Sequence, residues 1–416
     1  MGYRNHYLQI RDFLHPISPI WSNEVIQDAC ISISHYPRDW IESLSNLSEE
    51  ELFDLSKRRA KFLSLSDSLQ KTIETLTSLT IIPEFNLNTD SSNFRKLPPP
   101  ASQNLTPKKL HELSRVFQFL TRKRYLPSPS PVIDFCGGAG YSARTLAHFL
   151  NTESISVDKD TDLQQRGLKR TLRFIPDQAK KILFISHDVI NDNYSELINL
   201  LPKKSPIIGV HTCGKLSDIQ HTLAKDLESE WTLNIGCCYY KTTGEVFQCS
   251  EFAKQHPVSH TAFSLYLAAR GEENNISDFK FSCVVKKFRF MLHLFLLKEF
   301  GLNFIPVGSV PVSEYENNFE IYALGRLTIL KKNGKIPYIP EIKTINHFIQ
   351  DKHNIHTVQV MLACHFARLL FSRILELSVI LDRALFLEEA GYHTEITELF
   401  DYDVSPRNIV LFAYRD

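Results

Sequence analysis

The chain has 416 residues, a length that suggests roughly two or three folded domains. Lysine plus arginine and aspartate plus glutamate both number 47, so no global charge attracts the protein to nucleic acid or to an acidic membrane, although a local basic surface remains possible. Eight cysteines in a chain of this length do not indicate a secreted disulfide framework. The N-terminus is polar, and charges interrupt the most apolar stretch, at 288–304. We therefore expect a cytoplasmic protein without a membrane segment.

Residues 1–90 are predicted to form a helical N-terminal region, because apolar side chains recur there at helical spacing. Residues 91–104 follow as a proline-containing linker that is expected to be extended. Thr106 can then cap a helix that has Pro107 at its first position. The basic and polar residues in the first turns of this helix either face a ligand crevice or are simply solvated. Lys109 and His111 are the candidates there for cofactor contact.

The most informative stretch is 131–150. A short apolar run leads into an acid, a glycine-rich turn and a segment with helical spacing, which predicts a buried strand, a tight turn and a helix at the edge of an α/β sheet. Glycine in such a turn lets the backbone approach a nucleotide-like ligand, because no Cβ intervenes. The acid before the turn favours the cationic methionine end of S-adenosylmethionine over a dinucleotide diphosphate. The stretch resembles the pattern acid-x-Gly-x-Gly-x-Gly of S-adenosylmethionine sites, except that a cysteine stands at its first glycine position. The candidate cofactor-binding residues here are Asp134, Cys136, Gly137, Gly138 and Gly140.

Two later acids extend the predicted ligand crevice. Residues 154–158 and 183–188 are expected to be strands, and each ends in an aspartate. Asp158 lies about twenty residues past the glycine turn, where an acid can accept both ribose hydroxyls of an adenosine. Asp188 either meets the adenine amine or is a surface acid at a strand end.

The next two predicted strands, 206–214 and 233–240, carry histidine and cysteine near their carboxyl ends. In a doubly wound sheet these ends gather at one crevice, which places His211, Cys213, Cys237 and Cys238 near the glycine turn. A thiolate nucleophile with His211 as its base is one interpretation, and a zinc site is another. Simple packing of cysteine as a small apolar residue is the interpretation we favour, because no Cys-x-x-Cys spacing is present, so we predict no metal.

The remainder of the chain divides into two parts. Residues 251–375 are predicted to form a helical insertion, either a substrate lobe or a cover for the sheet, with loops and short strands at 308–340. Residues 376–416 are predicted to add a helix and an antiparallel strand pair that completes the sheet begun by the core at 105–250. The overall expectation is an α/β fold with a doubly wound sheet, a helical N-terminal region and a helical insertion.

Several motifs occur together and in a fixed order. They are Thr-Pro-Lys-Lys-x-His-Glu at 106–112, the glycine stretch, Val-His-Thr-Cys-Gly-Lys-Leu-Ser at 210–217, Gly-Cys-Cys-Tyr at 236–239 and Ser-Pro-Arg-Asn at 405–408. Together they resemble the methyltransferase-like protein 25 family, including its ribosomal RNA adenine dimethylase domain-containing branch. The motifs at 210–217 and 236–239 are also similar to elements of tRNA acceptor-stem 2′-O-methyltransferases. Adenine dimethylases, however, end the fourth strand in Asn-Pro-Pro-aromatic, and residues 211–214 here read His-Thr-Cys-Gly.

The resemblance implies a class I methyltransferase (Rossmann-like) fold with S-adenosylmethionine as cofactor. The resemblance implies no particular acceptor. We expect transfer of the methyl group to an unidentified macromolecule, RNA or protein; the alternative is an S-adenosylmethionine-binding interaction module without turnover. Because a sulfonium methyl is already activated, positioning of the acceptor supplies much of the rate. We assign His211 as base or orienting group for the acceptor, with Cys213 beside it on the acceptor side, and Cys238 and Tyr239 as walls of the acceptor pocket. His211 is also a candidate for cofactor contact.

Overall fold

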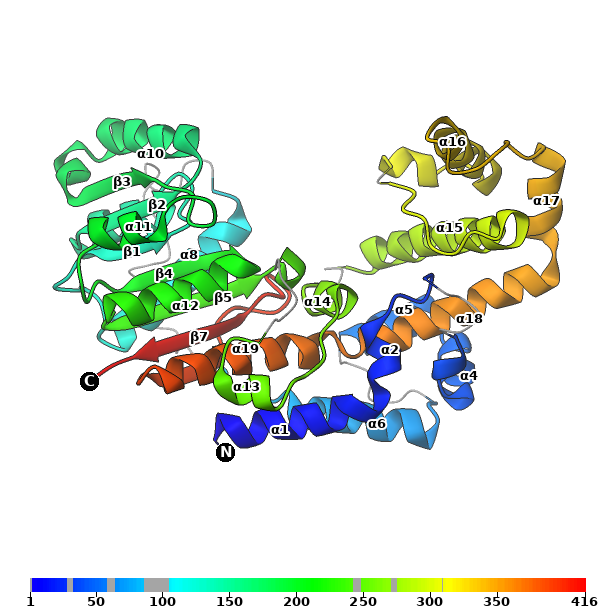
Figure 1. Cartoon of the computed structure of the whole chain (residues 1–416), viewed down its shortest axis with the longest axis horizontal. Coiled ribbons are helices and arrows are strands. Elements are labelled where there is room, and N and C mark those ends of the chain that lie inside the picture. Colours follow the sequence, from blue (N-terminus) through cyan, green and yellow to red (C-terminus); the bar gives the residue numbers. More distant parts are fainter. Residues whose placement is uncertain are drawn as a thin grey trace.

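The computed structural model describes residues 2–27, 33–57, 64–85, 105–241, 248–270, 275–308 and 310–416. The predicted linker at 91–104 lies outside these ranges. The described residues form a sheet domain, made of 105–241 and 372–416, and a helical lobe, made of the described parts of 2–85 and 248–370 (Figure 1). Among the described helices, none combines the length and the apolar character that crossing a membrane requires.

A seven-stranded sheet with the order β3-β2-β1-β4-β5-β7-β6 organises the first part. The strands are β1 (Val132–Phe135), β2 (Ser154–Asp158), β3 (Ile182–Ser186), β4 (Ile207–Cys213), β5 (Trp231–Cys237), β6 (His393–Glu398) and β7 (Ile409–Tyr414). The first five strands are parallel, and β7 pairs antiparallel with both β5 and β6. This is the predicted doubly wound sheet with a terminal antiparallel pair.

Helices cover both faces of this sheet, which explains why its central strands are apolar almost without interruption. All four residues of β1 and all seven of β5 are buried, as expected for parallel strands that are covered on both sides. Apolar residues of α8 and α9 pack against one face, and those of α11 and α12 against the other. The helices of the sheet domain are α8 (Pro107–Arg122), α9 (Tyr141–Leu150), α10 (Thr161–Phe174), α11 (Tyr194–Leu200), α12 (Lys215–Leu227) and α19 (Ser372–Glu389).

The helical lobe has a core that the N-terminal helices share with the helices after residue 250. Buried residues of α1, α4, α6, α15, α18 and α19 belong to one apolar cluster, which also reaches β7. The main helices of the lobe are α1 (Tyr3–Leu14), α2 (Ser18–Ser22), α4 (Arg38–Ser45), α5 (Glu49–Ser56), α6 (Asp67–Leu79), α13 (Glu251–Gln255), α14 (Ala262–Ala268), α15 (Ile276–Phe300), α16 (Phe319–Lys332), α17 (Ile342–Gln350) and α18 (Lys352–Leu369).

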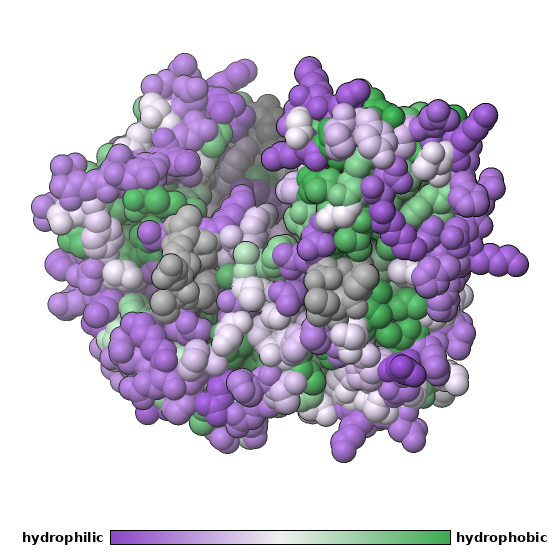
Figure 2. All heavy atoms as spheres, turned by 45° about the vertical axis from the view of Figure 1, so that its right-hand side comes forward, coloured by the Kyte–Doolittle hydropathy of each residue, from purple (hydrophilic) through white to green (hydrophobic). Residues whose placement is uncertain are grey.

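The helices α18 and α19 follow one another across the molecule and join the two parts (Figure 1). The predicted boundary at residue 375 therefore falls inside α19. In the space-filling view, the upper edge of the molecule is notched between the sheet domain and the helical lobe, and hydrophilic side chains line much of the rim (Figure 2).

One local expectation was wrong. Residues 308–340 were predicted to form loops and short strands, yet they contain the four-turn helix α16. Its buried side chains at 322, 323, 326, 327 and 330 follow helical spacing, so packing against the lobe stabilises a helix despite Gly325 in its interior. The prolines that suggested loops lie outside the helix on both sides.

Candidate functional site

The glycine turn after β1 is built around the buried carboxylate of Asp134. Its Oδ2 accepts a hydrogen bond from the backbone N–H of Ala143, in the first turn of α9, at 3.2 Å. A Cβ at position 137 would lie 2.5 Å from the same oxygen, so only glycine fits there. Burial is the largest influence on Asp134 and raises the pKa of its carboxyl to about 6.

Cys136 replaces a glycine by adopting the backbone conformation of one. Its φ is +57°, in the left-handed region that side chains disfavour by about 1–2 kcal/mol. Burial raises the pKa of the Cys136 thiol to about 12, which leaves it protonated at neutral pH. The cysteine therefore preserves the turn, and its neutral thiol packs against the apolar layer beneath the sheet.

A second acid lies across the turn from Asp134. The Oδ2 of Asp158, at the end of β2, accepts a hydrogen bond from the N–H of Gly138 at 2.9 Å. Its Oδ1 accepts another from the N–H of Asp160 at 2.9 Å. The structure thus brings together the two predicted acids at the edge where β1 and β2 end.

Asp188 lies two residues beyond the end of β3 and is engaged by its own loop. Its carboxylate accepts hydrogen bonds from the side-chain amide of Asn191 at 2.9 Å and from the N–H of Ile190 at 3.1 Å. The Asn191 bond is the main reason why the pKa of this carboxyl is lowered.

A cavity of about 300 Å³ opens beside the glycine turn. It is lined by Lys109, Cys136, Gly137, Gly138, Ala139, Tyr141, Leu163, Arg166 and Arg170. The Lys109 ammonium lies 5.4 Å from the centre of the Tyr141 ring, and Arg170 donates a hydrogen bond to the Tyr141 hydroxyl at 2.8 Å. The lining of this cavity is therefore cationic, which suits a carboxylate or phosphate group.

His111, by contrast, does not line this cavity. Its ring packs edge-on against Phe400, with centroids 6.2 Å apart, on the side where β6 leads into β7. Burial lowers the pKa of His111. Of the two candidates at the start of α8, only Lys109 reaches the glycine turn.

His211 occupies an irregular position in β4, where the pairing with β5 shifts register. Its φ is +63°, and its Nε2 donates a hydrogen bond to Oε2 of Glu112 at 2.9 Å. Glu112 is almost fully buried, and its other oxygen accepts a 2.7 Å bond from the Ser405 hydroxyl. Burial alone would raise the pKa of the Glu112 carboxyl, but its contacts with His211 and Ser405 lower it below the ordinary value.

The sequence did not identify Glu112 as a functional residue. The available signal was its place in the motif at 106–112, but nothing local predicted its partner. With the imidazole neutral, donation from Nε2 leaves Nδ1 as the accepting nitrogen of His211. The pair can therefore hold a histidine in one tautomer at the end of β4.

Three thiols gather beside His211. The Sγ atoms of Cys213, Cys237 and Cys238 all lie within 4.8 Å of one another, and those of Cys213 and Cys237 are 3.0 Å apart. The hydrogen bond between these two thiols lowers the pKa of Cys213 and raises the pKa of Cys237. At the ends of β4 and β5, therefore, one thiol of this hydrogen-bonded pair loses its proton more easily than the other.

Tyr239 does not occupy the predicted position in the acceptor wall. It is 0 % exposed, follows the end of β5, and donates a hydrogen bond from its hydroxyl to Oε1 of Glu376 at 3.2 Å. The Arg383 guanidinium lies 5.3 Å from the centre of its ring. The side chain therefore supports the strand ends from behind, inside a buried polar network of α19.

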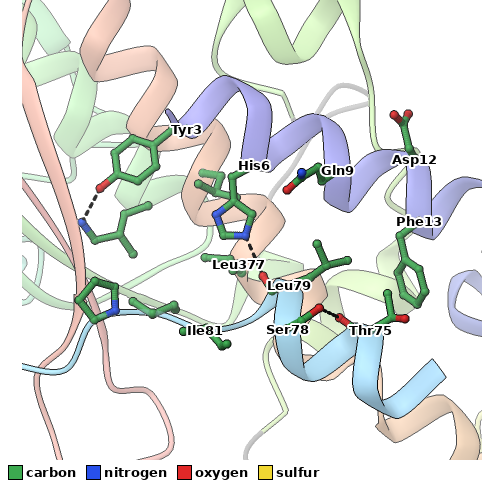
Figure 3. A pocket seen from close by; sticks show the side chains of 14 residues that line it. Tyr3, His6, Gln9, Asp12, Phe13, Thr75, Ser78, Leu79, Ile81 and Leu377 are labelled. Atoms are coloured by element: carbon green, nitrogen blue, oxygen red, sulfur yellow. Dashed lines mark hydrogen bonds between the residues drawn. The ribbon is translucent and has the colours of Figure 1, made fainter. Parts of the chain in front are cut away.

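A larger cavity, of about 880 Å³, lies where the helical lobe meets the sheet domain, between α1, the end of α6 with the segment after it, α19 and β6. In the close-up, His6 points to the carbonyl of Leu79, and Tyr3 reaches the neighbouring strand, where it accepts a bond from the N–H of Ile396 (Figure 3). This cavity is lined by none of the predicted site residues.

Comparison with known protein families agrees with this geometry. Residues 108–245 match a family model described as a methyltransferase domain. The matched range runs from α8 past β5 and includes the glycine turn, Asp158, His211 and the thiol cluster. The sheet order and the match together define a class I, Rossmann-like methyltransferase fold, and methyltransferase activity is the function that such a domain carries.

Proposed function

We propose that this protein transfers the methyl group of S-adenosylmethionine to a macromolecular acceptor, RNA or protein. The observation that carries the proposal is the pair of carboxylates, Asp134 and Asp158, on either side of the glycine turn in the matched domain. A cationic amino acid end and a ribose diol are the two parts of this cofactor that need such acceptors. Methyltransferase domains in general use S-adenosylmethionine.

The residues around the turn fit the cofactor. Asp134 would face its cationic methionine end, and Asp158 its ribose hydroxyls, once these hydroxyls displace the Gly138 N–H as donors. Lys109 would meet the carboxylate of the methionine part, since it lines the cationic cavity. Asp188 would accept the adenine amine alongside its loop contacts. At Gly138 a Cβ would meet only the side chain of Leu163, at 3.8 Å, so a ligand can approach the backbone there.

His211 is the group that we assign to the acceptor. When bound, the cofactor supplies an activated methyl group, so the protein's contribution is to align the acceptor and, where the acceptor carries a proton, to receive it. Glu112 is then a positioning residue, because its carboxylate fixes the tautomer and orientation of His211 without touching the acceptor. Cys213 and Cys238 remain as partly exposed walls beside it.

A macromolecular acceptor is supported by the helical lobe, which lies next to the sheet domain and leaves a notch between the two (Figure 2). The similarity of the motifs at 210–217 and 236–239 to elements of tRNA acceptor-stem 2′-O-methyltransferases keeps RNA among the candidate acceptors. No observation favours the non-catalytic interaction module over a transferase.

Two measurements test the proposal. Isothermal titration of the folded protein with S-adenosylmethionine and with S-adenosylhomocysteine should give saturable heat, and its absence would refute cofactor binding. Incubation with tritiated S-adenosylmethionine and fractionated cell RNA or cell protein should label one fraction and thereby name the acceptor class. Cofactor binding without label in either fraction would contradict methyl transfer and support the interaction module.

A further inference from the structure

The proposed methyl transfer gives the thiol cluster at the ends of β4 and β5 no chemical role. We propose that Cys213, Cys237 and Cys238 form a binding site for a thiophilic divalent metal ion, with zinc as the ion that fits best. This inference does not depend on the proposed function, since it rests on three sulfur atoms and the backbone that brings them together.

The distances suit a metal ion with thiolate ligands. Zinc binds thiolate sulfur at about 2.3 Å in tetrahedral geometry, which separates two ligating sulfurs by about 3.8 Å. The three Sγ atoms all lie within 4.8 Å of one another, and those of Cys213 and Cys237 are 3.0 Å apart, so the cluster has the dimensions that such a spacing needs. The three sulfurs are therefore close enough together to bind one ion.

The backbone is shaped to bring these sulfurs to one side. Successive residues in a strand point to opposite faces, so Cys237 and Cys238 would diverge if β5 continued. Instead β5 ends at Cys237, and Cys238 adopts a φ of +43°, a left-handed conformation that costs about 1–3 kcal/mol in a residue with a side chain. The cluster is thus maintained at a conformational cost.

The neighbouring strand contributes a matching irregularity. The register between β4 and β5 shifts at His211, and as a result Cys213 lies directly opposite Cys237. Both sulfurs also lie near the same backbone carbonyl, that of His211, at 3.5 Å and 3.4 Å. Two separate backbone irregularities therefore converge on the same three thiols, which packing of small apolar residues does not require.

The cluster is open to solvent on one side. Cys237 is buried, whereas Cys213 and Cys238 are partly exposed, so the site opens on one side. Among the described residues, no fourth histidine, cysteine or carboxylate side chain completes the cluster. Three protein ligands with an open fourth position leave room for water or another small ligand. Each thiol that binds the ion releases its proton to solvent.

The test uses the full-length protein, purified under reducing conditions and then exchanged into zinc or cobalt solution. We expect zinc to be retained at one equivalent per chain by elemental analysis, and cobalt to give a thiolate-to-metal charge-transfer band. Cys213→Ser and Cys238→Ser should each weaken zinc binding by at least roughly tenfold and reduce the cobalt band. Cys364→Ala is the matched control, because it removes a thiol that is buried in the helical lobe, and it should bind both ions like the native chain.

Circular dichroism of each variant establishes that it is folded before binding is compared. Folded native protein without retained zinc and without a cobalt charge-transfer band would overturn the proposal. It would also be overturned by a band that persists unchanged in both serine variants, or by a Cys213–Cys237 disulfide that forms despite the reductant. Titration with S-adenosylmethionine reports separately on the proposed function, so the two can fail independently.

Discussion

The Nε2 atom of His211 lies 2.9 Å from the Oε2 atom of Glu112, although 99 positions separate them in the sequence. The contact joins the first turns of α8 to the end of β4, across the edge of the sheet where the glycine turn lies. Because Ser405 binds the other oxygen of Glu112, the loop before β7 also takes part in holding the histidine. Three distant segments of the chain therefore define the orientation of one imidazole.

Replacing His211 by alanine should lower the rate of methyl transfer by roughly 10²-fold or more, because the group that orients the acceptor or receives its proton is lost. The expected affinity for S-adenosylmethionine is unchanged within about threefold, as measured by isothermal titration. The rate is measured as tritium incorporated into the acceptor fraction. Full activity of a folded His211→Ala protein would remove this residue from the mechanism.

Replacing Glu112 by glutamine should have a smaller effect on the rate, of roughly tenfold. The amide keeps the shape of the side chain and one acceptor oxygen, but it loses the charge that fixes His211 as a donor at Nε2. The loss should appear in the turnover rate and not in the affinity for S-adenosylmethionine. Glu112→Asp, which keeps the charge, should recover part of the rate, and Glu316→Gln, at an exposed position, should behave like the native chain. Equal rates for the glutamine and native proteins would show that Glu112 has only a structural role.

Replacing Asp158 by alanine should weaken S-adenosylmethionine binding by about 1–3 kcal/mol, since two hydrogen bonds from the ribose to a charged acceptor are lost. Titration calorimetry gives the difference directly. Asp162→Ala removes an exposed carboxylate from the first turn of α10 and serves as the control. If both variants bind the cofactor equally well, the ribose lies elsewhere.

Asp134 predicts a dependence of stability on pH. Its pKa in the folded protein, about 6, lies above the ordinary value of 3.8, so between these two values the folded state holds a proton that the unfolded state has lost. Stability from this group is therefore greatest near pH 4 and is lost as the pH rises through 6. At neutral pH the ionised, buried carboxylate costs on the order of 3 kcal/mol.

The variant Asp134→Asn should remove this dependence, because its side chain stays neutral. We expect thermal unfolding at pH 7 to shift upward, and the difference from the native protein to shrink as the pH falls to 4. Asp382, whose pKa burial also raises to about 6, should leave a residual dependence of the same sign in both proteins. The same variant should bind S-adenosylmethionine less tightly. A stability difference that is constant from pH 4 to 7 would contradict the assigned pKa.

Features encoded within a few residues were predictable, whereas contacts between distant segments were not. The glycine turn, Asp158 at the end of β2 and the Thr106 cap of α8 follow from local spacing, and the cap is present, since the Thr106 hydroxyl accepts from the Lys109 N–H. Whether a residue just past a strand faces a crevice depends on a single φ angle. Cys238 turns toward the cluster, but Tyr239 is buried behind it. The spacing of the sequence contains no comparable signal for such a turn or for the partner of Glu112.

Cys136 offers a test of the glycine turn itself. At a φ of +57° the cysteine carries conformational strain that glycine would not, and this favours Cys136→Gly by about 1–2 kcal/mol. Glycine also increases the entropy of the unfolded chain, by roughly 0.5–1 kcal/mol, and it loses the packing of the thiol.

Cys136→Ala separates these effects, because alanine keeps the strain and loses the same sulfur. We expect the free energy of unfolding of the Cys136→Gly protein to exceed that of the Cys136→Ala protein by about 1 kcal/mol. The native protein should be about as stable as the glycine variant. Denaturant unfolding midpoints, compared at equal m-values, rank the three proteins by stability. Alanine more stable than glycine would show that the turn relaxes to a negative φ in solution.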